Sequence, residues 1–211
     1  MLAIDAAGPR AGLAVVAADG AVLWKAFVPG RPGLIETLPV LLAQAAAAHR
    51  IDEVAVTIGP GSFTGLRTAL ALAQGFAAAA SLPLLGVTVA EAYAVAFPTL
   101  HRPLWVTIRA RAGRIFLLRD GGAEAYNDAD IPRVRNPVAL AGDAANEGAA
   151  RLAAAGADVL LTNARRLEPA WVAQAACARR AAGLPARAAL PLYVDPPEAK
   201  LPAAGLRPQP A

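Results

Sequence analysis

The fold of this chain is decided by Gly59-Pro60-Gly61-Ser62-Phe63-Thr64-Gly65-Leu66-Arg67-Thr68, which stands between two apolar segments. The preceding residues 54–58 are apolar and largely β-branched, a pattern that predicts a buried strand. The two glycines and the proline at 59–61 predict a sharp turn. Ser62 or Thr64 can cap the helix that we expect from Phe63 to Ala80. The stretch is therefore expected to join a strand to a helix through a tight turn.

Small residues recur at every fourth position of this predicted helix, at Gly65, Ala69, Ala73 and Ala77. Because residues four apart lie on one side of a helix, the stripe predicts a flat face against which another backbone can lie closely. The turn also resembles a phosphate-binding loop, but a Walker-type loop needs a lysine directly after its last glycine, and Leu66 follows Gly65. Anion binding at the helix N-terminus stays an alternative, and the interface interpretation is preferred.

Composition and charge indicate a globular protein, since 56% of the 211 residues are hydrophobic and the formal net charge is +4. Residues 101–211 hold fifteen Lys or Arg against ten Asp or Glu, spread out and without interleaved aromatic residues. This pattern favours a solvated surface over a nucleic-acid footprint. The single cysteine, Cys177, excludes an internal disulfide. No secretory signal or membrane span is recognisable, so we expect a cytoplasmic protein that does not contact a membrane.

The expected elements follow the order β-β-β-α-β-α-β-α and then begin again. Strands are predicted at 2–5, 12–16, 22–28, 54–58 and 84–87, and helices at 33–49, 63–80 and 89–96. Pro39 predicts a kink or a broken first turn in the first helix. A second unit opens with strands at 104–108 and 114–118 and continues with helices at 144–155 and 169–182 and a strand at 159–161. We therefore predict an α/β protein with an N-terminal lobe of residues 1–99 and a reduced C-terminal lobe of residues 100–211, which ends in an extended tail from Leu184.

A first strand ending in an aspartate, within this order and its reduced repeat, resembles the actin, sugar-kinase and Hsp70 superfamily with its RNase H-like lobes. Four segments make the resemblance specific. Met1–Asp5, Gly59–Arg67, Arg109–Phe116 and Pro191-Leu192-Tyr193 fall in the order and spacing of the TsaB (YeaZ) family. The match runs from residue 1 to about residue 200, and the chain is identified as a member of this glycoprotease-like family.

The resemblance implies a subunit without chemistry of its own that is needed to form threonylcarbamoyladenosine in tRNA. Its partners would be a larger TsaD-like paralogue, which holds the metal and the threonylcarbamoyl-adenylate, and a small TsaE-like P-loop ATPase. The tRNA would be reached through the complex. The resemblance implies no cofactor of its own, and it leaves open both a nucleotide at a composite site with the partners and a homodimer of the chain alone.

The sequence lacks the residues that catalysis would need, which agrees with a non-catalytic subunit. The catalytic paralogue holds its metal with two histidines four apart on a helix, whereas this chain has only His49 and His101, so no metal site is expected. The scarcity of histidine also argues against a peptidase. Asp5 and Arg10 flank the turn Ala6-Ala7-Gly8-Pro9, which carries no hydroxyl, and we interpret them as a vestigial phosphate and Mg²⁺ site. In the family a threonine usually follows this aspartate. Asp5 is expected to bind the neighbouring hairpin instead.

The partner surface is expected on the helices at 33–49 and 63–80. The predicted interface residues are Leu34, Leu38, Leu41, Leu42, Leu66, Leu70, Ala73 and Ala77. On the second helix, Leu66, Leu70 and Ala73 would point outward while Leu72, Phe76 and Ala79 face the sheet. The predicted loop and helix cap that aim the second helix are Gly59, Pro60, Gly61, Ser62, Thr64, Gly65 and Arg67. The alternative is that both helices simply cover the sheet of their own lobe.

Two functions agree with the sequence. The preferred one is a pseudoenzyme scaffold in a tRNA threonylcarbamoyltransferase complex. The alternative is an independent small ATP-dependent phosphotransferase or acyl-activating enzyme of the same fold. That enzyme would need a nucleotide site of its own and would lose its activity in the variant Asp5→Asn.

Overall fold

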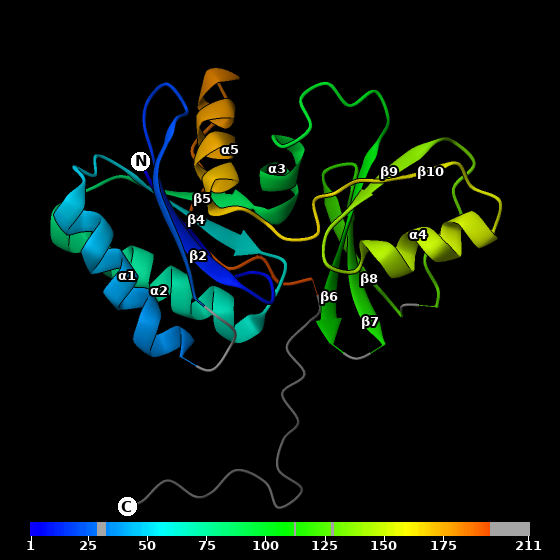
Figure 1. Ribbon diagram of the computed structural model, residues 1–211, viewed down its shortest axis with the longest axis horizontal. Coiled ribbons are helices and arrows are strands. Elements are labelled where there is room, and N and C mark those ends of the chain that lie inside the picture. The colour runs from blue at the N-terminus through cyan, green and yellow to red at the C-terminus, as the bar shows by residue number, and fades with distance from the viewer. Residues whose placement is uncertain (29–32, 112, 128, 195–211) are drawn as a thin grey trace, which may run out of the picture.

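The computed structural model describes residues 1–28, 33–111, 113–127 and 129–194. These residues form two five-stranded mixed sheets with helices, one in each of two lobes (Figure 1). The prediction of a two-lobed α/β fold is confirmed.

The first sheet has the strand order β3-β2-β1-β4-β5. Its strands are β1 (Leu2–Asp5), β2 (Ala11–Val16), β3 (Val22–Val28), β4 (Val54–Gly59) and β5 (Leu84–Thr88). The first three strands pair antiparallel, and β4 and β5 then add in parallel to β1. Every strand predicted for this lobe is present, with bounds that differ by at most one residue.

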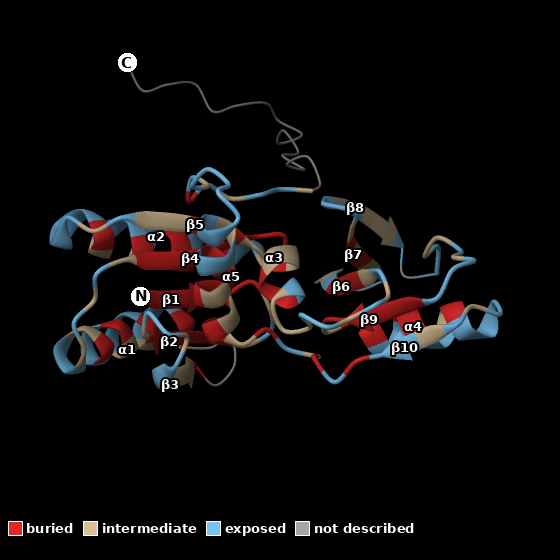
Figure 2. Cartoon of the chain, turned by 90° about the horizontal axis from the view of Figure 1, so that it is seen from above, coloured by how far each residue is buried: buried red, intermediate tan, exposed pale blue. Residues whose placement is uncertain are grey.

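Helices cover both faces of this sheet, so its central strands are apolar on both sides. Leu2 and Ile4 of β1 pack with α1 (Leu34–Ala48) and α2 (Phe63–Ala80), whereas Ala3 packs with α3 (Val89–Ala94) and α5 (Pro169–Ala181). This assignment follows the period of two along a strand. Figure 2 shows the result as almost continuously buried strands β1, β2 and β4.

The second sheet has the strand order β10-β9-β6-β7-β8. Its strands are β6 (Leu104–Arg111), β7 (Arg114–Arg119), β8 (Gly122–Asn127), β9 (Val138–Ala141) and β10 (Val159–Leu161). The helix α4 (Ala145–Ala154) packs on one face through Leu152. On the other face, Val106, Ile108 and Leu118 join the cluster that also contains Tyr93 and residues of α5. The two lobes therefore share a core.

The predicted lobe boundary needs one correction. The helix α5 comes after the second sheet in the sequence but packs on β1, β2, β4 and β5 of the first lobe (Figure 1). The tail that follows also returns to the first lobe, because the Gly86 amide donates to the Arg187 carbonyl and the Leu192 amide donates to the Ile58 carbonyl. The first lobe thus combines residues 1–99 with a C-terminal segment, and residues 195–211 of the predicted tail lie outside the described residues.

Two further expectations differ from the structure. The helix α1 is a single element that runs through Pro39, so a broken first turn is wrong. The strand predicted at 104–108 is longer, because β6 continues to Arg111. The strands β8 and β9 were not predicted.

Candidate functional site

The turn after β1 and the start of α2 are in close backbone contact. The Ser62 amide donates to the Ala7 carbonyl at 2.7 Å. A Cβ atom on Gly61 would lie 2.3 Å from the Ala7 carbonyl oxygen, and one on Gly65 would lie 2.1 Å from the Ala6 carbonyl oxygen. The close approach predicted for this stretch is therefore present, and the backbone that approaches belongs to this chain.

The structure also shows which residue caps α2 and which residues of the turn are exposed. Ser62 caps α2, since its hydroxyl accepts the Gly65 amide at 3.2 Å, while Thr64 lies exposed in the first turn. Pro60 is buried. Arg67 is exposed, lies 3.9 Å from the centre of the Phe63 ring, and donates from Nε to the Tyr193 hydroxyl at 3.1 Å. The tail thus ends, within the described residues, on the first turn of α2.

A pair of aspartates faces the cleft between the lobes, one from each sheet. Asp5 ends β1, and its Oδ1 accepts the Ala7 amide at 3.0 Å and the Thr57 hydroxyl at 2.8 Å. Asp143 follows β9 and accepts the Arg109 amide at 2.8 Å. The partners of Asp5 are thus its own turn and β4, and the expected hydrogen bond to the hairpin is wrong.

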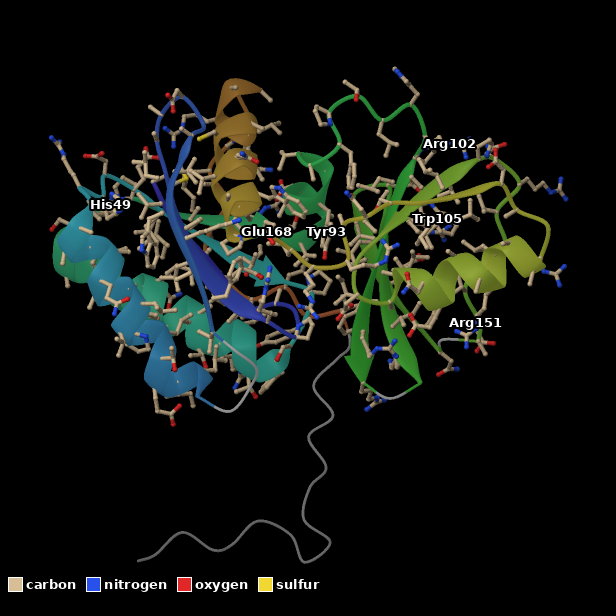
Figure 3. The ribbon with its side chains drawn as sticks, viewed as in Figure 1. His49, Tyr93, Arg102, Trp105, Arg151 and Glu168 are labelled. Atoms are coloured by element: carbon tan, nitrogen blue, oxygen red, sulfur yellow. The ribbon has the colours of Figure 1, made fainter. Side chains whose placement is uncertain are left out.

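Three other residues of the cleft were not predicted from the sequence. Tyr93 from α3 is buried there, and Arg165 and Arg166 line the same hollow. Figure 3 places Tyr93 and Glu168 in the middle of the molecule, whereas His49 lies at the far end of the first lobe. Asp143 carried a usable signal, because it follows an apolar strand as Asp5 does. Tyr93, Arg165 and Arg166 carried none, because only the folded chain brings them together.

Burial dominates the electrostatics of the cleft. Burial raises the pKa of Asp5 to about 6, although the Ala7 amide, the Thr57 hydroxyl and the Arg10 guanidinium act in the opposite direction. Burial likewise raises the pKa of Asp143, against the Arg109 amide and guanidinium. Both aspartates therefore hold their protons more tightly than exposed carboxyl groups do.

The cleft between the lobes is narrow. Its volume of about 10 Å³ is room for about one water molecule. The turn after β1 has few free amides to hold a phosphate, because the Ala7 amide binds Asp5 and Pro9 has no N–H. Arg10 is already paired with Glu168 at 2.8 Å and lies 3.6 Å from the centre of the Phe27 ring. Asp5 is therefore bound to its own turn and to β4, and Arg10 is paired with Glu168 before α5, although its buried Nε makes no hydrogen bond.

The variant Asp5→Asn is expected to remove a pH dependence of stability. With a folded-state pKa of about 6 against an ordinary value of 3.8, the folded chain keeps a proton that the unfolded chain has lost. The free energy of unfolding of the wild type should then fall as the pH rises from about 4 to about 6 and stay level above that. Asparagine keeps the Oδ1 acceptor and never ionises, so the variant should gain up to about 3 kcal/mol over the wild type across this range.

Urea denaturation at a series of pH values measures this difference. The control is Asp52→Asn, which changes an exposed carboxylate paired with Arg50 and should show no such trend. Parallel stability curves for Asp5→Asn and the wild type would contradict the prediction.

The predicted partner interface needs the main correction. Leu34, Leu38 and Leu42 of α1 and Leu66, Leu70, Ala73 and Ala77 of α2 are buried in the core of the first lobe, and Leu41 is half-buried. The residues expected to face the sheet lie elsewhere, because Leu72 and Phe76 are half-buried and Ala79 is exposed. The stripe of small residues therefore packs on the chain's own sheet, and the orientation predicted for α2 is inverted.

The opposite side of these two helices is exposed and almost uncharged. Of the exposed residues on α1 and α2, only Glu36 and Arg67 are charged. We call this surface the outer helical face, made up of Ile35, Pro39, Val40, Ala43, Ala47, Phe63, Ala71, Gly75 and Ala78. Ile35, Val40 and Phe63 are 64%, 55% and 56% exposed. A helix face that stays in water normally carries charged side chains, so this surface is a candidate docking site.

Within the part of the chain that the structure describes, no group of three or more His, Cys, Asp or Glu residues could hold a metal ion. Across that part, too, no helix combines the length and the apolar character that crossing a membrane requires.

Comparison with known proteins gives one family and several similar structures. The model of a family described as TsaD, tRNA N6-adenosine threonylcarbamoyltransferase, matches residues 33–163, more than half of the chain. No curated protein matches the sequence significantly.

Among solved structures, YeaZ from Pseudomonas aeruginosa is 21% identical with a TM-score of 0.67, covering 91% of this chain and 99% of that one. A protein described as similar to peptidase YeaZ from Pseudomonas aeruginosa is 21% identical with a TM-score of 0.68, covering 92% and 98%. A polyphosphate/ATP-glucomannokinase from Arthrobacter is 12% identical with a TM-score of 0.50, covering 86% and 98%. At these identities the structures show a shared fold.

Proposed function

Since the chain belongs to the TsaD family, described as tRNA N6-adenosine threonylcarbamoyltransferase, and has the fold of the YeaZ (TsaB) proteins, we propose that it is a non-catalytic subunit of that modification. The TsaB (YeaZ) resemblance and the fold of the actin, sugar-kinase and Hsp70 superfamily are confirmed. At family level, the membership connects the chain with threonylcarbamoyl modification of tRNA. The subunit role and the partner are our proposal.

The single observation that carries the proposal is the contrast between the two candidate sites. The cleft between the lobes has a volume of about 10 Å³ and its Asp5 and Arg10 are engaged within the chain. The outer helical face is apolar and exposed, and of its residues Phe63 contacts the tail at Tyr193. A closed cleft and an open apolar face support a binding subunit better than an independent ATP-dependent enzyme.

The proposed partner is a TsaD-like paralogue that docks on the outer helical face. Two helices with alanine and glycine on their outer sides let a second helix pair approach closely. At the end of this face, Phe63 packs against Tyr193 and Arg67 lies over the Phe63 ring. Aromatic and arginine side chains are the usual anchors of interfaces. A TsaE-like ATPase would join the pair, tRNA would bind through the complex, and any nucleotide would bind between subunits.

The variant Ala71→Arg is expected to weaken this heterodimer by at least about tenfold, because it places an unpaired charge in an apolar contact. The measurement is size-exclusion chromatography with light scattering on the chain mixed with its host's TsaD-like paralogue. The matched control is Ala153→Arg, on the exposed side of α4, which should leave the complex intact.

A complex that forms equally well with both variants would place the interface elsewhere. No complex with or without ATP and the small ATPase would favour the independent enzyme. ATP turnover that is lost in Asp5→Asn would then establish that alternative.

A further inference from the structure

A second hollow lies on the first lobe, away from the cleft and the outer helical face. It has a volume of about 70 Å³ and lies between the end of α5, the tail that follows it and the start of β5. Its lining is Leu85, Gly86, Ala176, Leu184, Ala186 and three arginines, Arg179, Arg180 and Arg187. Among the described residues that line it, the arginines are thus the only charged ones.

Two carboxylates hold these arginines from outside the hollow. Glu91 accepts Arg179 Nη1 at 2.8 Å and Arg187 Nη2 at 3.1 Å on the same oxygen, Oε1. Its other oxygen, Oε2, accepts the Thr88 amide and hydroxyl. Arg180 pairs with Glu53. Three guanidinium groups against two carboxylates leave a net positive charge around the hollow, and Glu91 holds two of these groups in place.

One donor in this cluster has no partner. The Nε of Arg187 is buried and makes no hydrogen bond. Leaving a buried charged donor unpaired is costly, and native structures rarely do so without a ligand or an ordered water. The Nε of Arg10 in the cleft is in the same state, so the unpaired donor supports a ligand only together with the positive charge around the hollow.

The end of α5 does not oppose an anion strongly. A helix C-terminus carries partial negative charge through its free carbonyl groups. Here the carbonyls of Ala178, Arg179 and Arg180 accept the amides of Ala182, Leu184 and Gly183. The tail therefore satisfies these carbonyl groups, and the basic side chains of the last turn dominate.

We propose that this hollow binds a phosphate group. Guanidinium groups bind phosphate oxygens through paired, charge-assisted hydrogen bonds. A phosphate group has more oxygen atoms than a carboxylate ligand, so it can accept hydrogen bonds from more of the three guanidinium groups around the hollow. The space exceeds what one water molecule needs. The phosphate comes either from a small molecule or from an RNA backbone.

The test is a titration of the ¹⁵N-labelled chain alone with sodium phosphate against sodium chloride of equal ionic strength, followed through backbone and arginine Nε–H signals. Phosphate should shift the Arg187 Nε–H signal saturably. The variant Arg187→Gln should weaken binding by about tenfold or more, the loss expected for one charged hydrogen-bond donor. Arg180→Gln, at a more exposed position, gives a second measure in case Arg187→Gln fails to fold.

The control Arg50→Gln removes an equal charge from a side chain that is 90% exposed and should bind phosphate like the wild type. A decaribonucleotide with a 5′-hydroxyl identifies the source: the same shifts, weakened by Arg187→Gln, indicate an RNA backbone, and none indicates a small phosphate. No saturable shift with phosphate, or equal binding by the wild type and both pocket variants, would overturn the proposal. Because the partner is absent, either result leaves the proposed subunit function untouched.

Discussion

The variant Leu70→Arg is expected to destabilise the first lobe strongly. Leu70 is 4% exposed and packs among Leu2, Ile4 and Val56 of the sheet and the buried side chains of α1. Arginine there would place a charge in an apolar core without a partner, which costs about 4 kcal/mol or more. For a chain of this length, such a loss should lower the melting temperature by more than about 10 °C.

Circular dichroism melting curves of Leu70→Arg and Ala71→Arg test this expectation, because the two variants introduce the same side chain at adjacent positions. Ala71 belongs to the outer helical face and is exposed, so Ala71→Arg should change the free energy of unfolding by no more than about 0.5 kcal/mol. A melting curve for Leu70→Arg that stays as high as that for Ala71→Arg would mean that Leu70 points outward, contrary to the structure. The same pair separates loss of folding from loss of partner binding.

The bounds of α2 could be predicted from the sequence, but its orientation could not. A β-branched strand, a turn of glycine and proline, and a serine cap fix where the helix begins. The helix itself is apolar on almost every side, since Arg67 is its only charged residue. Hydrophobic periodicity identifies the buried side only when polar residues mark the other one. The stripe of small residues therefore correctly predicted a close contact, but it did not indicate that the contact is with the chain's own sheet.

The second lobe and the cleft show a different limit. The strand β9 has four residues, and β8 has the sequence Gly-Ala-Glu-Ala-Tyr-Asn, which carries little of the β-branched character that predicts a strand. The return of α5 to the first sheet has no local signal at all, because its packing on Ala3, Ala14 and Ala55 depends on residues more than a hundred positions away. Asp5 and Asp143 likewise line one cleft from two different sheets, although they lie 138 positions apart in the sequence.

The variant Gly65→Ala is expected to lower the free energy of unfolding by about 3 kcal/mol, although alanine is the better helix former. Its Cβ would lie 2.1 Å from the Ala6 carbonyl oxygen and 3.2 Å from the Ser62 Oγ. The closer atom is backbone, so either α2 or the turn after β1 must move. That turn holds the Ala7 amide on Asp5, so a shift there should also weaken the hydrogen bonds of the buried aspartate.

Gly75→Ala in the same helix is the matched control for this contact. Gly75 is exposed, and a Cβ added there meets nothing within 4 Å, so only the gain in helix propensity remains, worth up to about 1 kcal/mol. Urea denaturation should therefore give changes of opposite sign for the two glycines. If both substitutions stabilise the protein, the start of α2 can move away from the turn at no cost. The close approach of the two backbones would then have no part in fixing the outer helical face.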